Sequence, residues 1–207
     1  MATADIHRTI ETVWKIEAPR LIAGLARMLR DVGQAEDLAQ EALVVALERW
    51  PTDGVPDNPG AWLMTTAKRR AIDQLRHNRM RDDKQAALDY ELQPDAMTHA
   101  PDHADALDDD IGDDLLRLIF TACHPVLTRD MQVALTLRML GGLTTPEIAR
   151  AFLVPEPTVA QRIVRAKRTL AEKQVPFEVP RGEELAPRLA AVLEVVYLIF
   201  NEGYTAT

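Results

Sequence analysis

The chain has one cysteine, Cys123, few aromatic residues and no long apolar run among its 207 residues. A single cysteine excludes an internal disulfide, and the His and acidic residues do not show the spacing of a zinc site, so neither a metal nor another cofactor is expected. No stretch approaches the roughly 20 uncharged apolar residues that a membrane-spanning helix needs, and polar residues stand where a signal peptide has its apolar core. We therefore expect a cytoplasmic protein without a membrane span.

The composition favours helices over strands. Apolar residues make up 47% of the chain, with Leu, Ala and Val dominant, whereas aromatic residues make up only 5%. Strands would be richer in branched and aromatic side chains. The predicted fold class is all-α, and the length suits one large domain or two small ones.

The negative charge is concentrated in one segment. The formal net charge is -8, yet residues 82–114 contain 12 acidic residues and one basic residue, Lys84. The rest of the chain holds 23 basic and 20 acidic residues, a net charge of +3. This segregation predicts basic helical modules that are joined by an acidic linker.

The first half of the chain predicts helices that are separated by one loop. Apolar residues recur at helical spacing from about residue 6 to residue 30, where Pro19 is expected to begin a second helix. The next helix, "AEDLAQEALVVALERW", has two apolar rows and one remaining stripe. That stripe consists of Asp37, Gln40, Glu41, Val44 and Glu48. The loop "PTDGVPDNPG" follows, and Asn58 is placed to cap a helix that begins at Pro59.

The helix after this loop, "AWLMTTAKRRAIDQLRHNRMR", begins apolar and ends basic. Six Lys or Arg residues lie between residues 68 and 81, against one acid, Asp73. Helical periodicity returns at "DDLLRLIFTACHPVLTRDMQVALTLRML", where two helices are expected with a break near Pro125.

The segment "TTPEIARAFLVPEPTVAQRIVRAKRTL", residues 144–170, predicts a helix-turn-helix whose first helix is capped by Thr144 or Thr145. In its second helix a buried stripe is expected at Val159, Ile163, Ala166 and Leu170. The side chains that face the other way are polar or basic: Thr158, Gln161, Arg162, Arg165 and Arg168. Lys167 is a further candidate for DNA contact. This chemistry suits DNA, because arginine pairs with guanine edges, glutamine with adenine, and other cations with phosphates.

Each feature alone has a simpler interpretation. A charged helix face is often merely solvated, Asp73 can pair with Arg69 or Arg76 on its own helix, and Trp62 is more often a core residue than a base-stacking one. Two other functions therefore stay open: a stand-alone helix-turn-helix regulator, which usually dimerises on a palindrome, and a helical adaptor protein. Neither requires the stripe from Asp37 to Glu48.

The order of the features is more specific than any one of them. The chain resembles a bacterial sigma factor of the extracytoplasmic-function (ECF) type in the sigma-70 family, which keeps only the domains called region 2 and region 4. "AEDLAQEALVVALERW" looks like the region 2 helix that docks on RNA polymerase, through the family's Asp-x-x-Gln-Glu pattern. "NPGAWLMTTAKRRAIDQLRHNR" looks like the segment that melts and reads the minus-ten element. The helix-turn-helix looks like the region 4 reader of the minus-thirty-five element, with Leu153 where the family commonly has glycine.

The resemblance implies a transcription initiation factor that is not an enzyme and has no catalytic residue. Its partners would be core RNA polymerase and promoter DNA, both double-stranded and melted. It assigns polymerase docking to the stripe above and minus-thirty-five contacts to the polar and basic side chains of the second helix. It assigns minus-ten contacts to Trp62, Lys68, Arg69, Arg70, Arg76 and Arg79. The expected regulator is an anti-sigma protein or the chain's own C-terminal extension.

The expected domains are region 2 at residues 1–81, an acidic flexible linker at 82–112, region 4 at 113–175 and an apolar helix in an extension at 176–207. This extension resembles the start of a helical-repeat domain that one sigma subgroup carries. We expect the chain to be truncated there. The alternatives are that the apolar helix packs on region 4, on the linker or on a second copy.

Overall fold

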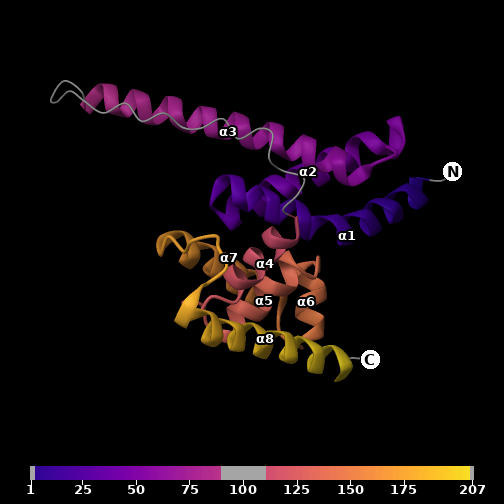
Figure 1. Ribbon diagram of the computed structural model, residues 1–207. Helices are drawn as coiled ribbons and strands as arrows, with labels where there is room; N and C mark the ends of the chain where they lie inside the picture. Colours follow the sequence, from indigo (N-terminus) through magenta and orange to yellow (C-terminus); the bar gives the residue numbers. More distant parts are fainter. Residues whose placement is uncertain (1–2, 90–110, 206–207) are drawn as a thin grey trace.

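The computed structural model describes residues 3–89 and 111–205, and every regular element in these two ranges is a helix (Figure 1). The all-α prediction is therefore confirmed. The elements are α1 (Thr3–Leu29), α2 (Val32–Asp53), α3 (Pro59–Asp89), α4 (Ile111–Ala122), α5 (Arg129–Met139), α6 (Thr145–Ala151), α7 (Glu156–Glu172), a short 3-10 turn (Gly182–Glu184) and α8 (Leu185–Thr205).

The helices form two groups that lie against each other, with α8 on the far side of the second group (Figure 1). In the first group α1, α2 and α3 pack pairwise, and in the second α7 packs on α5 and α6. The groups meet where α1 contacts α4 and α5 and where α2 contacts α7. Their buried apolar side chains join into one continuous cluster. We call this contact between the two groups the seam.

Helix α1 continues through Pro19, so the prediction that a second helix begins there is wrong. Proline has no backbone N–H, which leaves the carbonyl oxygen of Lys15, four residues earlier, without its helical donor. The glycine at position 142 approaches this point of α1. Gly142 has a φ of 63°, and a Cβ atom added to it would lie 3.4 Å from the Lys15 Cα. Glycine suits both this left-handed conformation and this close approach.

The start of α3 agrees with the sequence, whereas the end of α2 does not. Asn58 Oδ1 accepts a hydrogen bond from the Ala61 N–H at 3.0 Å, so Asn58 caps α3 as predicted. Helix α2, however, includes Pro51 and ends only at Asp53. At its other end α3 runs to Asp89, past the expected start of the linker at residue 82. The rest of the expected linker, residues 90–110, lies outside the described residues.

The helix-turn-helix forms as the sequence predicts. The Thr144 hydroxyl caps the Glu147 N–H while the Glu147 carboxylate accepts from the Thr144 N–H, which is a complete capping box. All four residues of the predicted stripe on α7 are buried: Val159, Ile163, Ala166 and Leu170. In the turn Leu153 has a φ of 51° and is 92% exposed, so it makes the turn without contributing to the core.

Helix α8 has an inner face that packs on α4 and α5 of the second helix group and an outer face that does not. Val192 and Val195 are buried, and Arg188 donates a hydrogen bond to the Phe120 carbonyl oxygen at 2.8 Å. The outer face exposes 40% to 70% of five apolar residues: Leu185, Leu189, Leu193, Val196 and Phe200. The inner face thus packs on the second helix group, whereas the outer face stays exposed.

Replacement of the cap residue, Thr144→Ala, should destabilise the chain by about 1 kcal/mol, because it removes the side-chain partner of an N-terminal N–H of α6. Urea unfolding followed by circular dichroism measures the change. The exposed threonine of α2 provides a control, Thr52→Ala, which should leave the unfolding midpoint unchanged. Equal midpoints for the two variants would contradict the capping role.

Candidate docking and DNA-binding surfaces

The predicted docking stripe lies on the side of α2 that the fold does not bury. The opposite side of α2 packs into the core through five residues: Leu38, Ala39, Ala42, Ala46 and Trp50. Among the stripe residues Asp37, Glu41, Val44 and Glu48 are exposed, and Gln40 is half-buried. Val44 exposes 52% of its surface. The stripe is therefore an acidic surface with an apolar residue near its centre, which suits contact with another protein.

Beside this stripe lies a buried acid, Glu36, which the sequence pattern did not single out. Only 3% of its side chain is exposed. Its Oε1 accepts hydrogen bonds of 2.6 Å from Arg138 Nε and from Gln40 Nε2, and its Oε2 forms an ion pair with Lys167. Lys167 also pairs with Asp37 Oδ1 at 3.0 Å. Helical spacing does place Glu36 one turn before Gln40, but nothing in the sequence links it to Arg138, which is 102 positions away.

The pKa of Glu36 is lowered despite the burial of its side chain. Burial by itself raises the pKa of this carboxyl group, because it penalises the charged form. The attraction of Lys167, together with hydrogen bonds from Lys167 and Arg138, outweighs this penalty and holds the pKa below its ordinary value. The charge at this point of the seam thus depends on cations from α5 and α7.

Most of the predicted minus-ten residues lie on the exposed side of α3. Arg69 and Arg70 are exposed, Lys68 is half-buried, and Arg76 is exposed beside Asp73, with 4.0 Å between Arg76 Nη1 and Asp73 Oδ1. Arg70 forms an ion pair with Glu41 of the docking stripe. The Arg79 side chain lies outside the described residues.

Trp62, the aromatic candidate for this surface, serves the core of the first helix group. Its ring packs edge-to-face on Trp50, with 5.4 Å between ring centroids and 69° between ring planes. Such a T-shaped pair adds to the stabilisation from apolar burial. Because the packed ring is half-buried, it presents only part of itself for a base to stack on.

On α7 some of the predicted DNA-reading residues form ion pairs with carboxylates, and others are exposed without such a pair in the described part of the chain. Arg162 Nη2 pairs with Asp130 Oδ2 at 2.6 Å, Arg168 Nε pairs with Glu172 Oε1 at 2.6 Å, and Lys167 reaches across the seam. Gln161 and Arg165 are exposed, and Thr158 is half-buried. Arg165 has no carboxylate within ion-pair distance in the described part of the chain. The structure thus brings a predicted DNA contact, Lys167, against a predicted docking residue, Asp37.

Within residues 3–89 and 111–205 no group of three or more His, Cys, Asp or Glu residues is placed to hold a metal ion. Cys123 is buried, and burial raises the pKa of its thiol, which disfavours the reactive thiolate. Its sulfur lies 3.5 Å from the Thr136 hydroxyl oxygen. The same ranges include no helix that is both long and apolar enough to span a bilayer.

Comparison with known proteins identifies both helix groups. The family model for sigma-70 region 2 matches residues 14–81, and the model for sigma-70 region 4 matches residues 117–170. The ECF RNA polymerase sigma factor SigK of Mycobacterium ulcerans is 32% identical over 158 residues, which cover 73% of this chain and 78% of the relative. SigK of Mycobacterium tuberculosis strain H37Rv is 31% identical over 155 residues, with the same coverage.

A longer relative matches more of the chain. An uncharacterised protein of Rhizobium meliloti strain 1021 is 42% identical over 190 residues, which cover 91% of this chain but 44% of the relative. The chain thus spans less than half the length of this relative.

The ion pairs of Glu36 predict a pH-dependent contribution to stability. Glu36→Gln should lower the free energy of unfolding at neutral pH by about 1.5 to 3 kcal/mol, the usual range for hydrogen bonds to charged groups. Because the folded-state pKa lies below the ordinary value of 4.5, this contribution is present above pH 4.5 and is lost as the pH falls through the folded pKa.

Urea unfolding of both proteins at neutral pH and below pH 4.5 measures this effect. The difference between wild type and Glu36→Gln should shrink on acidification, and a constant difference would contradict the assignment. An exposed residue on the same helix provides the control, because Glu48→Gln should leave stability unchanged at neutral pH.

Proposed function

Because the chain belongs to the ECF sigma factors of the sigma-70 family, we propose that it binds core RNA polymerase in the cytoplasm and directs it to specific promoters. Sigma factors are initiation factors and not enzymes, which agrees with the expectation that the chain has no catalytic residue. The observation that carries the proposal is that one chain combines an acidic docking stripe on α2 with an exposed Gln161 and Arg165 on the second helix of a helix-turn-helix.

Docking through α2 follows from the character of its stripe. A surface that binds protein must not itself be basic, because it would otherwise compete for DNA. The exposed part of the stripe meets this condition with Glu41, Val44 and Glu48. Neither the stand-alone regulator nor the adaptor requires such a surface next to a helix-turn-helix, so the sigma function explains more of the molecule.

For promoter DNA the two basic surfaces take different tasks. Melting the minus-ten element requires cations for single-stranded phosphates, and we assign this task to Lys68, Arg69, Arg70, Arg76 and Arg79 of α3. Trp62 supports this surface mainly by packing on Trp50. We assign the reading of the minus-thirty-five element to α7, where the exposed Arg165 suits a guanine edge. Once one surface is bound, the other binds almost intramolecularly.

We further propose that the chain belongs to the sigma subgroup with a helical-repeat extension after region 4. In support, α8 follows region 4 and keeps an apolar outer face. An anti-sigma protein or the extension itself would then regulate the factor.

Polymerase docking is best tested at the end of the stripe away from the Asp37–Lys167 ion pair. The double variant Val44→Ala, Glu48→Ala should weaken binding to bacterial core RNA polymerase by about tenfold, a loss of about 1.4 kcal/mol of binding free energy. Size-exclusion co-elution and titration of labelled chain into core polymerase measure it.

The matched control for this pair lies on α1, where an aliphatic and an acidic residue are also exposed, Ile16 and Glu11. The double variant Ile16→Ala, Glu11→Ala should bind core polymerase as the wild type does. If the α2 variant keeps wild-type affinity, the docking assignment is wrong. If the wild type itself does not bind, the sigma function is wrong.

Base reading by α7 predicts a sequence-dependent loss. Arg165→Ala should cost about 1 to 3 kcal/mol of binding free energy on a duplex that carries the preferred minus-thirty-five sequence, selected from a random pool. Fluorescence anisotropy at fixed salt measures the affinity. Arg20→Ala, which removes an exposed arginine of α1, is the control for a general loss of positive charge. An equal loss on a scrambled duplex would exclude base reading by Arg165.

A further inference from the structure

We propose that an ionic clasp holds regions 2 and 4 together in a closed form of the isolated chain, and that this clasp must open before polymerase covers the whole docking stripe and Lys167 reaches DNA. The clasp consists of Glu36 and Asp37 on α2, Arg138 on α5 and Lys167 on α7. The inference rests on the proposed sigma function, because it concerns residues assigned to polymerase docking and to DNA.

The clasp is a buried ionic contact in which the carboxylate has more than one cationic partner. Glu36 is almost fully buried, while Arg138 and Lys167 expose 22% and 20% of their side chains. Each Glu36 oxygen meets a cation, and Lys167 is shared with Asp37. A surface salt bridge is commonly worth little, but a carboxylate removed from water needs such partners.

Other contacts hold the seam along α1. Lys15 Nζ lies 3.4 Å from Glu147 Oε1 of α6, and Arg27 Nε lies 3.2 Å from Asp114 Oδ2 of α4. The left-handed Gly142 packs on the backbone of Lys15. Region 4 therefore contacts region 2 at several separate points, through two ion pairs and one close backbone approach.

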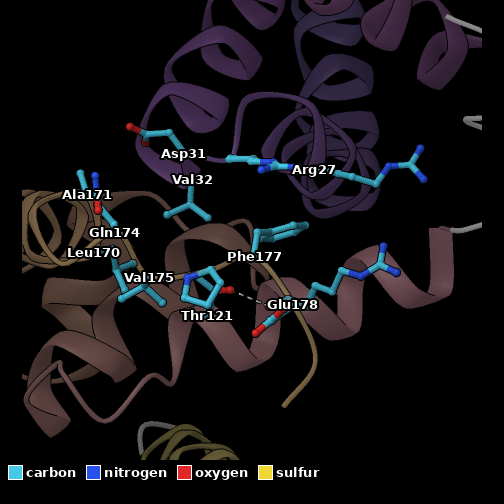
Figure 2. Close-up of a pocket in the computed structure, with 13 residues that line it drawn as sticks. Arg27, Asp31, Val32, Thr121, Leu170, Ala171, Gln174, Val175, Phe177 and Glu178 are labelled. Atoms are coloured by element: carbon cyan, nitrogen blue, oxygen red, sulfur yellow. Dashed lines mark hydrogen bonds between the residues drawn. The ribbon is translucent and has the colours of Figure 1, made fainter. Parts of the chain in front are cut away.

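The seam is nevertheless incompletely packed. A crevice of about 700 Å³ opens between the α1–α2 turn and the end of α7 (Figure 2). Arg27 and Val32 face it from the first helix group, and Val175 and Phe177 face it from the second. A contact that combines ion pairs with an open crevice resembles an interface between domains more than a single core, and such interfaces commonly separate.

DNA contact by Lys167 requires this residue to leave the clasp. Its ammonium group is suited to a DNA phosphate, and phosphate contacts supply much of the affinity for DNA. In the closed form Lys167 Nζ lies 3.0 Å from Asp37 Oδ1 of region 2 and also pairs with Glu36, so it is not available to a phosphate.

The clasp also couples the two binding surfaces. Two docking residues are tied into it, because Asp37 pairs with Lys167 and Gln40 bonds to Glu36. A polymerase surface that covers the stripe from Asp37 onward meets α7 at that end. A partner that binds only the open form has a lower apparent affinity, because part of the chain is closed. Polymerase and DNA would both favour the open form, so the binding of one would raise the affinity for the other.

A disulfide across the seam tests the proposal. A Cβ atom added to Gly33 would lie 3.6 Å from the Lys167 Cβ, within the usual range for a disulfide. The double variant Gly33→Cys, Lys167→Cys should therefore form this bond in the isolated chain with oxidised glutathione as oxidant. The native Cys123 is buried and does not compete. Even brief visits to the closed form are captured, so failure to form the bond would overturn the proposal.

The binding measurement compares the oxidised and reduced forms of this one variant, since both lack Lys167. The oxidised form should bind core polymerase at least about tenfold more weakly than the reduced form, while the two single-cysteine variants and the wild type should not respond to oxidation. Equal binding by both forms overturns the clasp and leaves the sigma function standing. If neither form nor the wild type binds, the sigma function fails, and the clasp proposal fails with it.

A second variant opens the clasp without a cross-link or the loss of a predicted DNA contact. Glu36→Gln keeps the shape of the side chain and removes its charge. It should raise the affinity of the isolated chain for core polymerase, by up to about tenfold if the closed form is tenfold in excess. The control Glu11→Gln, on the exposed side of α1, should bind as the wild type does. An unchanged or lowered affinity for Glu36→Gln would overturn the proposal.

Discussion

A buried carboxylate is stable only where cations or donors replace the water that it has lost. Glu36 meets this constraint with partners from both regions: Gln40 from its own helix, Arg138 from α5 and Lys167 from α7. Neither region satisfies the group alone while it stays buried. If the regions separate, water solvates all of these groups again, so the free energy difference between closed and open forms is a small difference of large terms. A partner with modest selectivity for the open form is then enough to open the chain.

Local rules account for most of the helices. The buried stripe on α7, the Thr144 cap, the Asn58 cap and the break near Pro125 all appear where the sequence predicts them, because periodicity and capping depend on neighbours within one or two turns. The exposure of the proposed docking stripe was predictable for the same reason. Once two rows of α2 are apolar, the remaining positions have to face outward.

The features that were not predictable depend on contacts between distant segments. Pro19 is a sound signal for a helix start, yet the chain tolerates it inside α1, where packing on other helices offsets one missing hydrogen bond. Glu36 reads as one more acid on an acidic helix, and only the approach of α5 and α7 buries it. The exposed outer face of α8 is likewise invisible to periodicity, which shows that a helix has an apolar side but not whether anything covers it.

The predicted DNA contacts on α7 differ in whether the seam covers them. Lys167 engages Glu36 and Asp37, so carboxylates of region 2 take the place that a DNA phosphate would occupy. Arg165 and Gln161, the side chains suited to base edges, stay exposed. Phosphate contacts supply much of the affinity for DNA, whereas base contacts supply the specificity. If α7 reads DNA as proposed, the closed chain withholds a part of its affinity while the proposed reading residues remain in place. On this proposal a chain with a net charge of -8 carries a DNA-reading helix and still depends on a larger partner to use it.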